Sequence, residues 1–144
     1  MKNQIQKIQT LQANQLLQMQ IQNHKDLIVW QKSTDLSVLI YELTAKFPKE
    51  EQFGLSSQMR RAAVSIPSNI AEGRQRGTKK DFLNFLRIAK GSSAELETQI
   101  VIAKKLSFSK DLNYSKIDTM IEEVIKMLRA MIFKLSLPAN KLTS

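Results

Sequence analysis

The apolar residues in the last part of the chain recur with the period of an α-helix. Between Ile117 and Leu135 they fall every three or four positions, and most charged residues fall opposite them. This spacing places the apolar side chains on one side of a helix, which then needs other helices to cover it. Only four Gly and three Pro occur in 144 residues, too few for a turn-rich β-sandwich or a Gly-rich phosphate-binding unit. The sequence therefore predicts an all-α fold.

Four helices are predicted between residues 25 and 137. Asp26 is the expected N-cap of the first helix, which Phe47-Pro48 stops. Ser56 is the expected N-cap of the second helix, and Gly73 is placed to end it.

The third helix is predicted to begin at Thr78, which forms a capping-box pattern with Asp81, and to reach about Leu106. The fourth helix is predicted over about residues 113–137, before Pro138. The short connections favour an antiparallel, up-down four-helix bundle.

Two terminal segments are predicted to lie outside this bundle. Residues 1–24 contain eight Gln and no acidic residue, so we expect a Gln-rich arm that is weakly helical or disordered. A helix that docks on a partner or on a neighbouring subunit is the alternative for this arm. Residues 138–144 are expected to form a C-terminal tail.

Composition removes most kinds of enzyme chemistry. The chain has no Cys and a single His, His24, which excludes thiol nucleophiles and thiolate metal sites and leaves almost no imidazole catalysis. We therefore expect a protein that is not an enzyme and that needs no metal or cofactor. No stretch approaches the roughly 20 apolar residues of a membrane span, and no signal-peptide core is present, so a cytoplasmic location is expected.

The charge balance indicates a polyanionic partner. Lys and Arg number 22 against 13 Asp and Glu, a formal net charge of +9 with a pI near 9.9, and nucleic acid is the commonest such partner. Residues 59–91 alone hold eight basic and two acidic residues. The predicted nucleic-acid-binding residues are Arg60, Arg61, Arg74, Arg76, Lys79, Lys80, Arg87 and Lys90. A solvated face and an acidic protein partner are the alternatives.

The aromatic residues predict how such binding works. Trp30, Tyr41, Tyr114 and the six Phe fall mostly on apolar faces of the predicted helices. No stacking platform is expected among the basic residues, so binding should depend on phosphate contacts more than on the bases.

The first predicted helix carries a second apolar stripe besides its core stripe. A bundle helix needs only one such stripe, and exposed aromatic patches usually mark interfaces. The predicted homo-oligomer interface consists of Leu27, Trp30, Val38 and Tyr41. A centrally buried helix is the alternative explanation.

The second predicted helix contains Pro67, which has no amide hydrogen to donate to the Ala63 carbonyl. Nearby polar side chains are expected to satisfy the helix backbone there; they are Ser65, Ser68 and Asn69. In the third helix the small residues that begin at Gly91 should let another helix approach closely. Glu72 and Glu95 are predicted to hydrogen-bond across this seam rather than to act in catalysis.

Four sequence stretches resemble a known bacterial family. They start at Asp26-Leu-Ile-Val-Trp-Gln-Lys, Phe47-Pro-Lys-Glu-Glu, Gln58-Met-Arg-Arg-Ala-Ala-Val and Gly91-Ser-Ser-Ala-Glu-Leu-Glu-Thr, and the third continues through Ser65-Ile-Pro-Ser-Asn-Ile-Ala-Glu-Gly. Over about residues 25–136 the chain resembles the 23S rRNA intervening-sequence proteins, a family that includes the accessory variability proteins of diversity-generating retroelements. The motif residues that carry the resemblance are Ser65, Pro67, Asn69, Glu72, Gly73 and Gly91.

The resemblance implies an antiparallel four-helix protomer that assembles into a basic pentameric barrel. In the retroelement members this barrel binds nucleic acid and a partner reverse transcriptase, whereas the intervening-sequence members have no defined biochemical role. We therefore expect a non-catalytic, oligomeric, basic scaffold that binds RNA or DNA. A protein–protein adaptor without direct nucleic-acid binding is the alternative.

Overall fold

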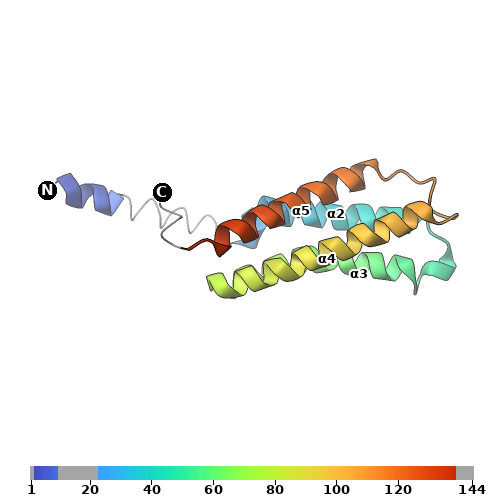
Figure 1. Cartoon of the computed structure of the whole chain (residues 1–144), viewed down its shortest axis with the longest axis horizontal. Coiled ribbons are helices and arrows are strands. Elements are labelled where there is room, and N and C mark those ends of the chain that lie inside the picture. Colours follow the sequence, from blue (N-terminus) through green and yellow to red (C-terminus); the bar gives the residue numbers. More distant parts are fainter. Residues whose placement is uncertain (1, 10–22, 139–144) are drawn as a thin grey trace.

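The computed structural model describes residues 2–9 and 23–138, and all regular elements in these ranges are helical (Figure 1). They are the 3₁₀ helix η1 (His24–Asp26), α2 (Ile28–Thr44), the 3₁₀ helix η2 (Lys49–Glu51), α3 (Leu55–Gln75), α4 (Lys79–Lys105) and α5 (Ser115–Ser136). The predicted all-α class is confirmed. Residues 2–9 are also helical, so the count of four helices applies to α2–α5 and not to the whole chain. Residues 1 and 10–22 of the predicted arm, and residues 139–144 of the predicted tail, lie outside the described residues.

Helices α2–α5 lie lengthwise beside one another (Figure 1). Each packs against its neighbours along the chain, and α5 returns to pack against α2. Every helix contributes fully buried side chains to the shared core, among them Leu36, Met59, Leu86 and Leu128. The apolar stripe that predicts each helix is thus the face by which it contacts the others.

The starts of α2 and α3 differ from the predictions. Asp26 does not cap α2, because the Asn23 side chain accepts a hydrogen bond from the Lys25 amide and begins η1 instead. At α3, Ser56 lies buried in the first turn. The Leu55 amide donates to Glu51 Oε2 over 3.1 Å, so a carboxylate from the preceding turn takes the capping role.

The turn between α3 and α4 also differs from the prediction at Gly73. This residue is buried inside α3, which continues to Gln75. The glycine that reverses the chain is Gly77, whose φ of 83° is the left-handed conformation that glycine adopts readily. The predicted cap of α4 is confirmed, since Thr78 Oγ1 accepts from the Asp81 amide over 3.1 Å.

A small hydrogen-bond network closes the connection between α4 and α5. Ser109 Oγ donates to the Ala103 carbonyl over 2.6 Å, and the Tyr114 hydroxyl donates to the Ser109 carbonyl over 2.8 Å. Burial raises the pKa of the Tyr114 hydroxyl, so the group keeps its proton and its role as donor. The first and last residues of α4 and of α5 each lie within two residues of the predicted positions.

The gap that Pro67 leaves in α3 is filled from another helix. Ser37 of α2 lies with its Oγ 3.1 Å from the Ala63 carbonyl and 3.0 Å from the Ser33 carbonyl, so its proton is shared between the two. The expectation that local side chains would act here is wrong, because Asn69 donates to the Ser65 carbonyl instead. A proline inside α3 is therefore tied to a hydroxyl on α2.

Replacing Ser37 with Ala is expected to lower the free energy of unfolding by about 1–3 kcal/mol, because it leaves the Ala63 carbonyl without this donor. Combining S37A with P67A supplies a backbone amide at position 67, so the same serine replacement should then cost less. Denaturant unfolding of the two single variants and the double variant measures this coupling. An equal cost of S37A in both backgrounds would contradict the proposed link.

The small-residue seam on α4 lies beside Gly91 rather than at it. A Cβ built on Gly91 meets nothing within 4 Å, so no helix approaches this position closely. Ser92 Oγ lies 2.8 Å from Ser65 Oγ of α3, and Ser93 is fully buried. At this point α3 and α4 are joined by a hydrogen bond between serines and not by a contact at Gly91.

Candidate nucleic-acid interface

The structure brings six of the eight predicted basic residues together and separates the other two. From the Ser65–Ser92 contact toward the turn between α3 and α4, the chain carries Arg74, Arg76, Lys79, Lys80, Arg87 and Lys90. Arg60 and Arg61 lie on the other side of that contact. Arg61 and Arg74 are thirteen positions apart along α3, a distance of about 20 Å at the rise of an α-helix.

Four cations at this end are free to contact a ligand. The side chains of Lys79, Lys80, Arg87 and Lys90 are exposed, and none forms an ion pair with any described residue. They lie within three turns of one helix. Together they form a row of unneutralised charge of the kind that binds phosphates.

Two arginines at the same end are held against aromatic rings. The guanidinium of Arg74 lies 5.6 Å from the centre of the Phe82 ring, and that of Arg76 lies 5.2 Å from the centre of the Phe85 ring. Arg76 also pairs with Glu72 over 3.0 Å. Glu72 is exposed, so the prediction that it hydrogen-bonds across the seam is wrong; Glu95 is exposed as well, and Gln99 of its own helix contacts it.

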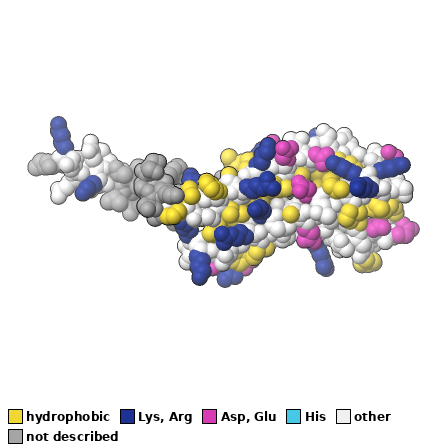
Figure 2. Space-filling view, viewed as in Figure 1, with side chains coloured by type: hydrophobic (Ala, Val, Ile, Leu, Met, Phe, Trp, Pro, Cys, Tyr) yellow, Lys and Arg dark blue, Asp and Glu magenta, His cyan; other side chains and the backbone are white. Residues whose placement is uncertain are grey.

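Charge is segregated along the length of the bundle. We call the half that contains the turn between α3 and α4 the basic end; it comprises residues 23–36, 66–92 and 125–138. It holds eleven Lys and Arg against four Asp and Glu, a net charge of +7, whereas residues 37–65 and 93–124 hold eight against nine, a net charge of −1. Figure 2 shows most of the visible acidic side chains over the half away from the basic end.

Sequence reasoning missed the contribution of α5 to the basic end. Arg129 and Lys134 are exposed there, and Lys126 is exposed beside Glu122, with 3.2 Å between the charged atoms. The signal was available, because an up-down bundle places the end of its last helix beside the turn between its second and third helices.

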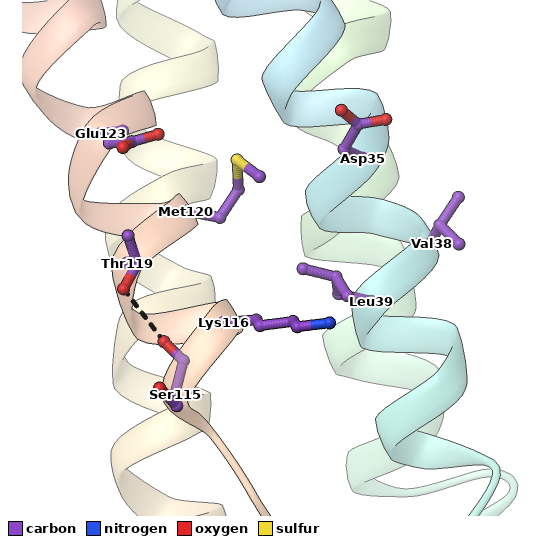
Figure 3. A pocket seen from close by; sticks show the side chains of 8 residues that line it. All are labelled: Asp35, Val38, Leu39, Ser115, Lys116, Thr119, Met120 and Glu123. Carbon is purple, nitrogen blue, oxygen red and sulfur yellow. Dashed lines mark hydrogen bonds between the residues drawn. The ribbon is translucent and has the colours of Figure 1, made fainter.

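A groove between α2 and α5 has a mixed character (Figure 3). It has a volume of about 540 Å³, and apolar side chains of Val38, Leu39 and Met120 lie in its lining. Asp35 and Glu123 add negative charge and Lys116 positive charge. Glu123 is already paired with Lys32 over 2.5 Å. This groove therefore has no strong preference for an anion.

The residues of the predicted oligomer interface lie in three different surroundings. Leu27 and Trp30 pack partly against the core, and the Trp30 ring also meets the His24 ring edge-on at 5.2 Å. Val38, 56% exposed, borders the groove between α2 and α5. Tyr41, 46% exposed, faces a second groove between α2 and α3.

This geometry defines a class of protein, namely an all-helical protein whose basic residues are concentrated at one end. The family model described as 23S rRNA-intervening sequence protein matches residues 25–130, and the chain belongs to this family.

Solved structures agree with the fold, and three chains match. One of them is a crystal structure, at 1.70 Å resolution, of a protein of unknown function from the S23 ribosomal protein family of Bacteroides thetaiotaomicron VPI-5482. It is 28% identical to this chain with a TM-score of 0.64, and the match covers 73% of this chain and 98% of that one. No curated protein matches the chain. None of the helices in the described part of the chain is long and apolar enough to cross a membrane.

Proposed function

We propose that this protein is a non-catalytic scaffold that binds nucleic acid through its basic end. The observation that supports the proposal is the row formed by Lys79, Lys80, Arg87 and Lys90, exposed and unpaired among the described residues, inside a half-bundle with a net charge of +7. Such a row neutralises phosphates and releases their counterions, which supplies affinity without base recognition.

The test is the salt dependence of binding by the full chain. Fluorescently labelled structured RNA and duplex DNA are titrated at several salt concentrations. If the six cations of α3 and α4 at the basic end each contact one phosphate, the slope of log K against log salt is about −5 on a duplex. An affinity that hardly changes between low and moderate salt contradicts this mechanism.

The surroundings of the lone histidine support the absence of catalysis in this proposal. His24 Nδ1 lies 3.2 Å from Gln75 Nε2, and its ring packs edge-on against Trp30. Both contacts tie η1 to the bundle and give the imidazole a structural task. Detectable cleavage of RNA by the purified protein would overturn this part of the proposal.

An acidic protein is the second candidate ligand, because the same basic end suits it equally well. The resemblance to retroelement proteins implies a reverse transcriptase as a partner protein for such an adaptor. Co-purification that survives nuclease treatment, together with no binding to purified nucleic acid, would favour this adaptor function over the scaffold function.

We also propose that copies of the chain associate through the outer side of α2. Ile28 and Val38 are 60% and 56% exposed on this helix, and large exposed apolar side chains are typical of interfaces. A homo-oligomer, a pentamer by the resemblance, repeats the basic end and so raises affinity for a long polyanion.

Replacing Val38 with Glu is expected to shift the assembly toward the monomer, because the charge would be buried between copies. Sedimentation velocity of the full chain measures the shift. V101E is the matched control, since Val101 is also exposed but lies on α4. Equal masses of V38E and the unaltered oligomer would contradict an interface at α2.

A further inference from the structure

We propose that the groove between α2 and α3 binds an unpaired base and its phosphate from a single-stranded nucleic acid. The inference rests on the proposed function and extends it, since it names a second contact with a different ligand preference. The groove has a volume of about 640 Å³. Its lining combines two aromatic rings, two arginines and serine hydroxyls, here Tyr41, Phe53, Arg60, Arg61, Ser57 and Ser68.

The aromatic component is exposed to an unusual degree. Phe53, in the turn between η2 and α3, is 90% exposed, and Tyr41 on the opposite wall is 46% exposed. Every nucleobase has a flat π-face, and an exposed ring gains from covering itself with one. The sequence-based expectation of no stacking platform among basic residues does not hold at this groove.

The two arginines of the groove differ in how their side chains are held. Arg60 donates from Nε to Thr44 Oγ1 over 2.8 Å, and its guanidinium lies 4.5 Å from the centre of the Tyr41 ring. These two contacts orient Arg60, while its terminal amino groups make no hydrogen bond to the described residues. Arg61 is exposed and forms no ion pair within the described part of the chain. Each guanidinium thus keeps donors for a phosphate.

The sign of the charge distinguishes this groove from the one between α2 and α5. No Asp or Glu is among the residues that line it. The acid nearest to Phe53 in sequence, Glu51, accepts a hydrogen bond from the Leu55 amide and caps α3. Arginine next to exposed aromatic rings, without a carboxylate, fits a ligand that is both flat and anionic.

The need for an unpaired base indicates a single strand. A strand whose bases are not paired can turn one of them into the groove while its phosphate reaches the two arginines. The bases of a duplex are paired and stacked, so a duplex would engage the basic end alone.

Replacing Phe53 with Ala is expected to weaken binding of a twelve-nucleotide single strand roughly fivefold to a hundredfold, the loss typical of one stacked base. Binding of a twelve-base-pair duplex should not change. F53W should restore the affinity, and the added indole should lose fluorescence when the strand binds. I102A is the control, because Ile102 is 44% exposed but lies on α4, outside both the groove and the basic end. Fluorescence anisotropy measures the affinity of the unaltered protein and of each variant for the single strand and for the duplex.

Three outcomes would overturn the inference. Unchanged single-strand binding by F53A would remove the stacking contact and leave the proposed function intact. An equal loss on duplex and single strand would show an effect that is not base stacking. A change in sedimentation of F53A without nucleic acid would assign the groove to contacts between copies. If the unaltered protein bound neither nucleic acid, the proposed function itself would fail, a result distinct from these three.

Discussion

A variant in which four exposed cations of the basic end are replaced by Gln is expected to bind duplex and structured RNA roughly a hundredfold more weakly. The four residues are Lys79, Lys80, Arg87 and Lys90. Each neutralised phosphate contributes about 0.9 to the salt slope on a duplex, so the slope should fall in magnitude by about 3.6. Anisotropy titrations at several salt concentrations give both quantities. The protein should remain folded, because all four side chains are exposed.

The matched control removes the same charge from the other half of the bundle. Four exposed lysines there are replaced by Gln, namely Lys46, Lys49, Lys110 and Lys116. Both variants then have the same net charge, so any difference between them reports where the charge lies. We expect the control to lose much less affinity. Equal losses would show that net charge alone drives binding, and they would contradict an interface at the basic end.

Local chemistry explains which features of the helices could be predicted from the sequence. The start of α4 was predicted correctly because Thr78 and Asp81 form the cap among themselves. The starts of α2 and α3 were not, because in each case a residue upstream of the expected cap acts first. Asn23 begins η1 before Asp26, and Glu51 reaches the Leu55 amide before Ser56. More than one residue near each of these ends is able to cap a helix, so the sequence pattern did not identify the one that acts.

Contacts between helices lay beyond what the sequence pattern could predict. The donor to the Ala63 carbonyl comes from Ser37, 26 positions away along the chain, whereas the pattern offered only the neighbours of Pro67. The exposure of Phe53 is of the same kind. Phenylalanine is normally a core residue, and only the turn between η2 and α3 places this ring in solvent.

The candidate interface shows when residues that are close in sequence are also close in space, and when they are not. Residues 74–90 are contiguous across a tight turn, so their charges stay together at one end of the bundle. Arg60 and Arg61 are about as close to Arg74 in sequence as Arg87 and Lys90 are. The rise of helix α3 nevertheless places them about 20 Å from Arg74. Arg129 and Lys134 are distant in sequence and belong to the same end of the bundle. A prediction of topology has to be combined with the charge pattern before a surface can be drawn.

Adding one methyl group at two glycines is expected to change stability in opposite directions. A Cβ on Gly73 would lie 2.5 Å from Phe85 Cβ and 3.4 Å from Phe82 Cα. Since Phe85 Cβ is bonded directly to the backbone of α4 and cannot swing away, α3 and α4 must move apart, and overpacking of this kind costs about 1–3 kcal/mol. A Cβ on Gly91 meets nothing within 4 Å, so G91A should gain about 0.5–1 kcal/mol from the helix preference of Ala over Gly.

Denaturant unfolding of G73A and G91A measures both free energies under the same conditions. Because the chemical change is the same and both positions are helical, the difference between them isolates the close approach of α3 to α4 at Gly73. A stabilising effect of G73A would show that the two helices are not in contact there. Gly73 directly precedes Arg74, whose guanidinium lies over the Phe82 ring. The same close contact that excludes a methyl group therefore also sets where the first cation of the basic end is held.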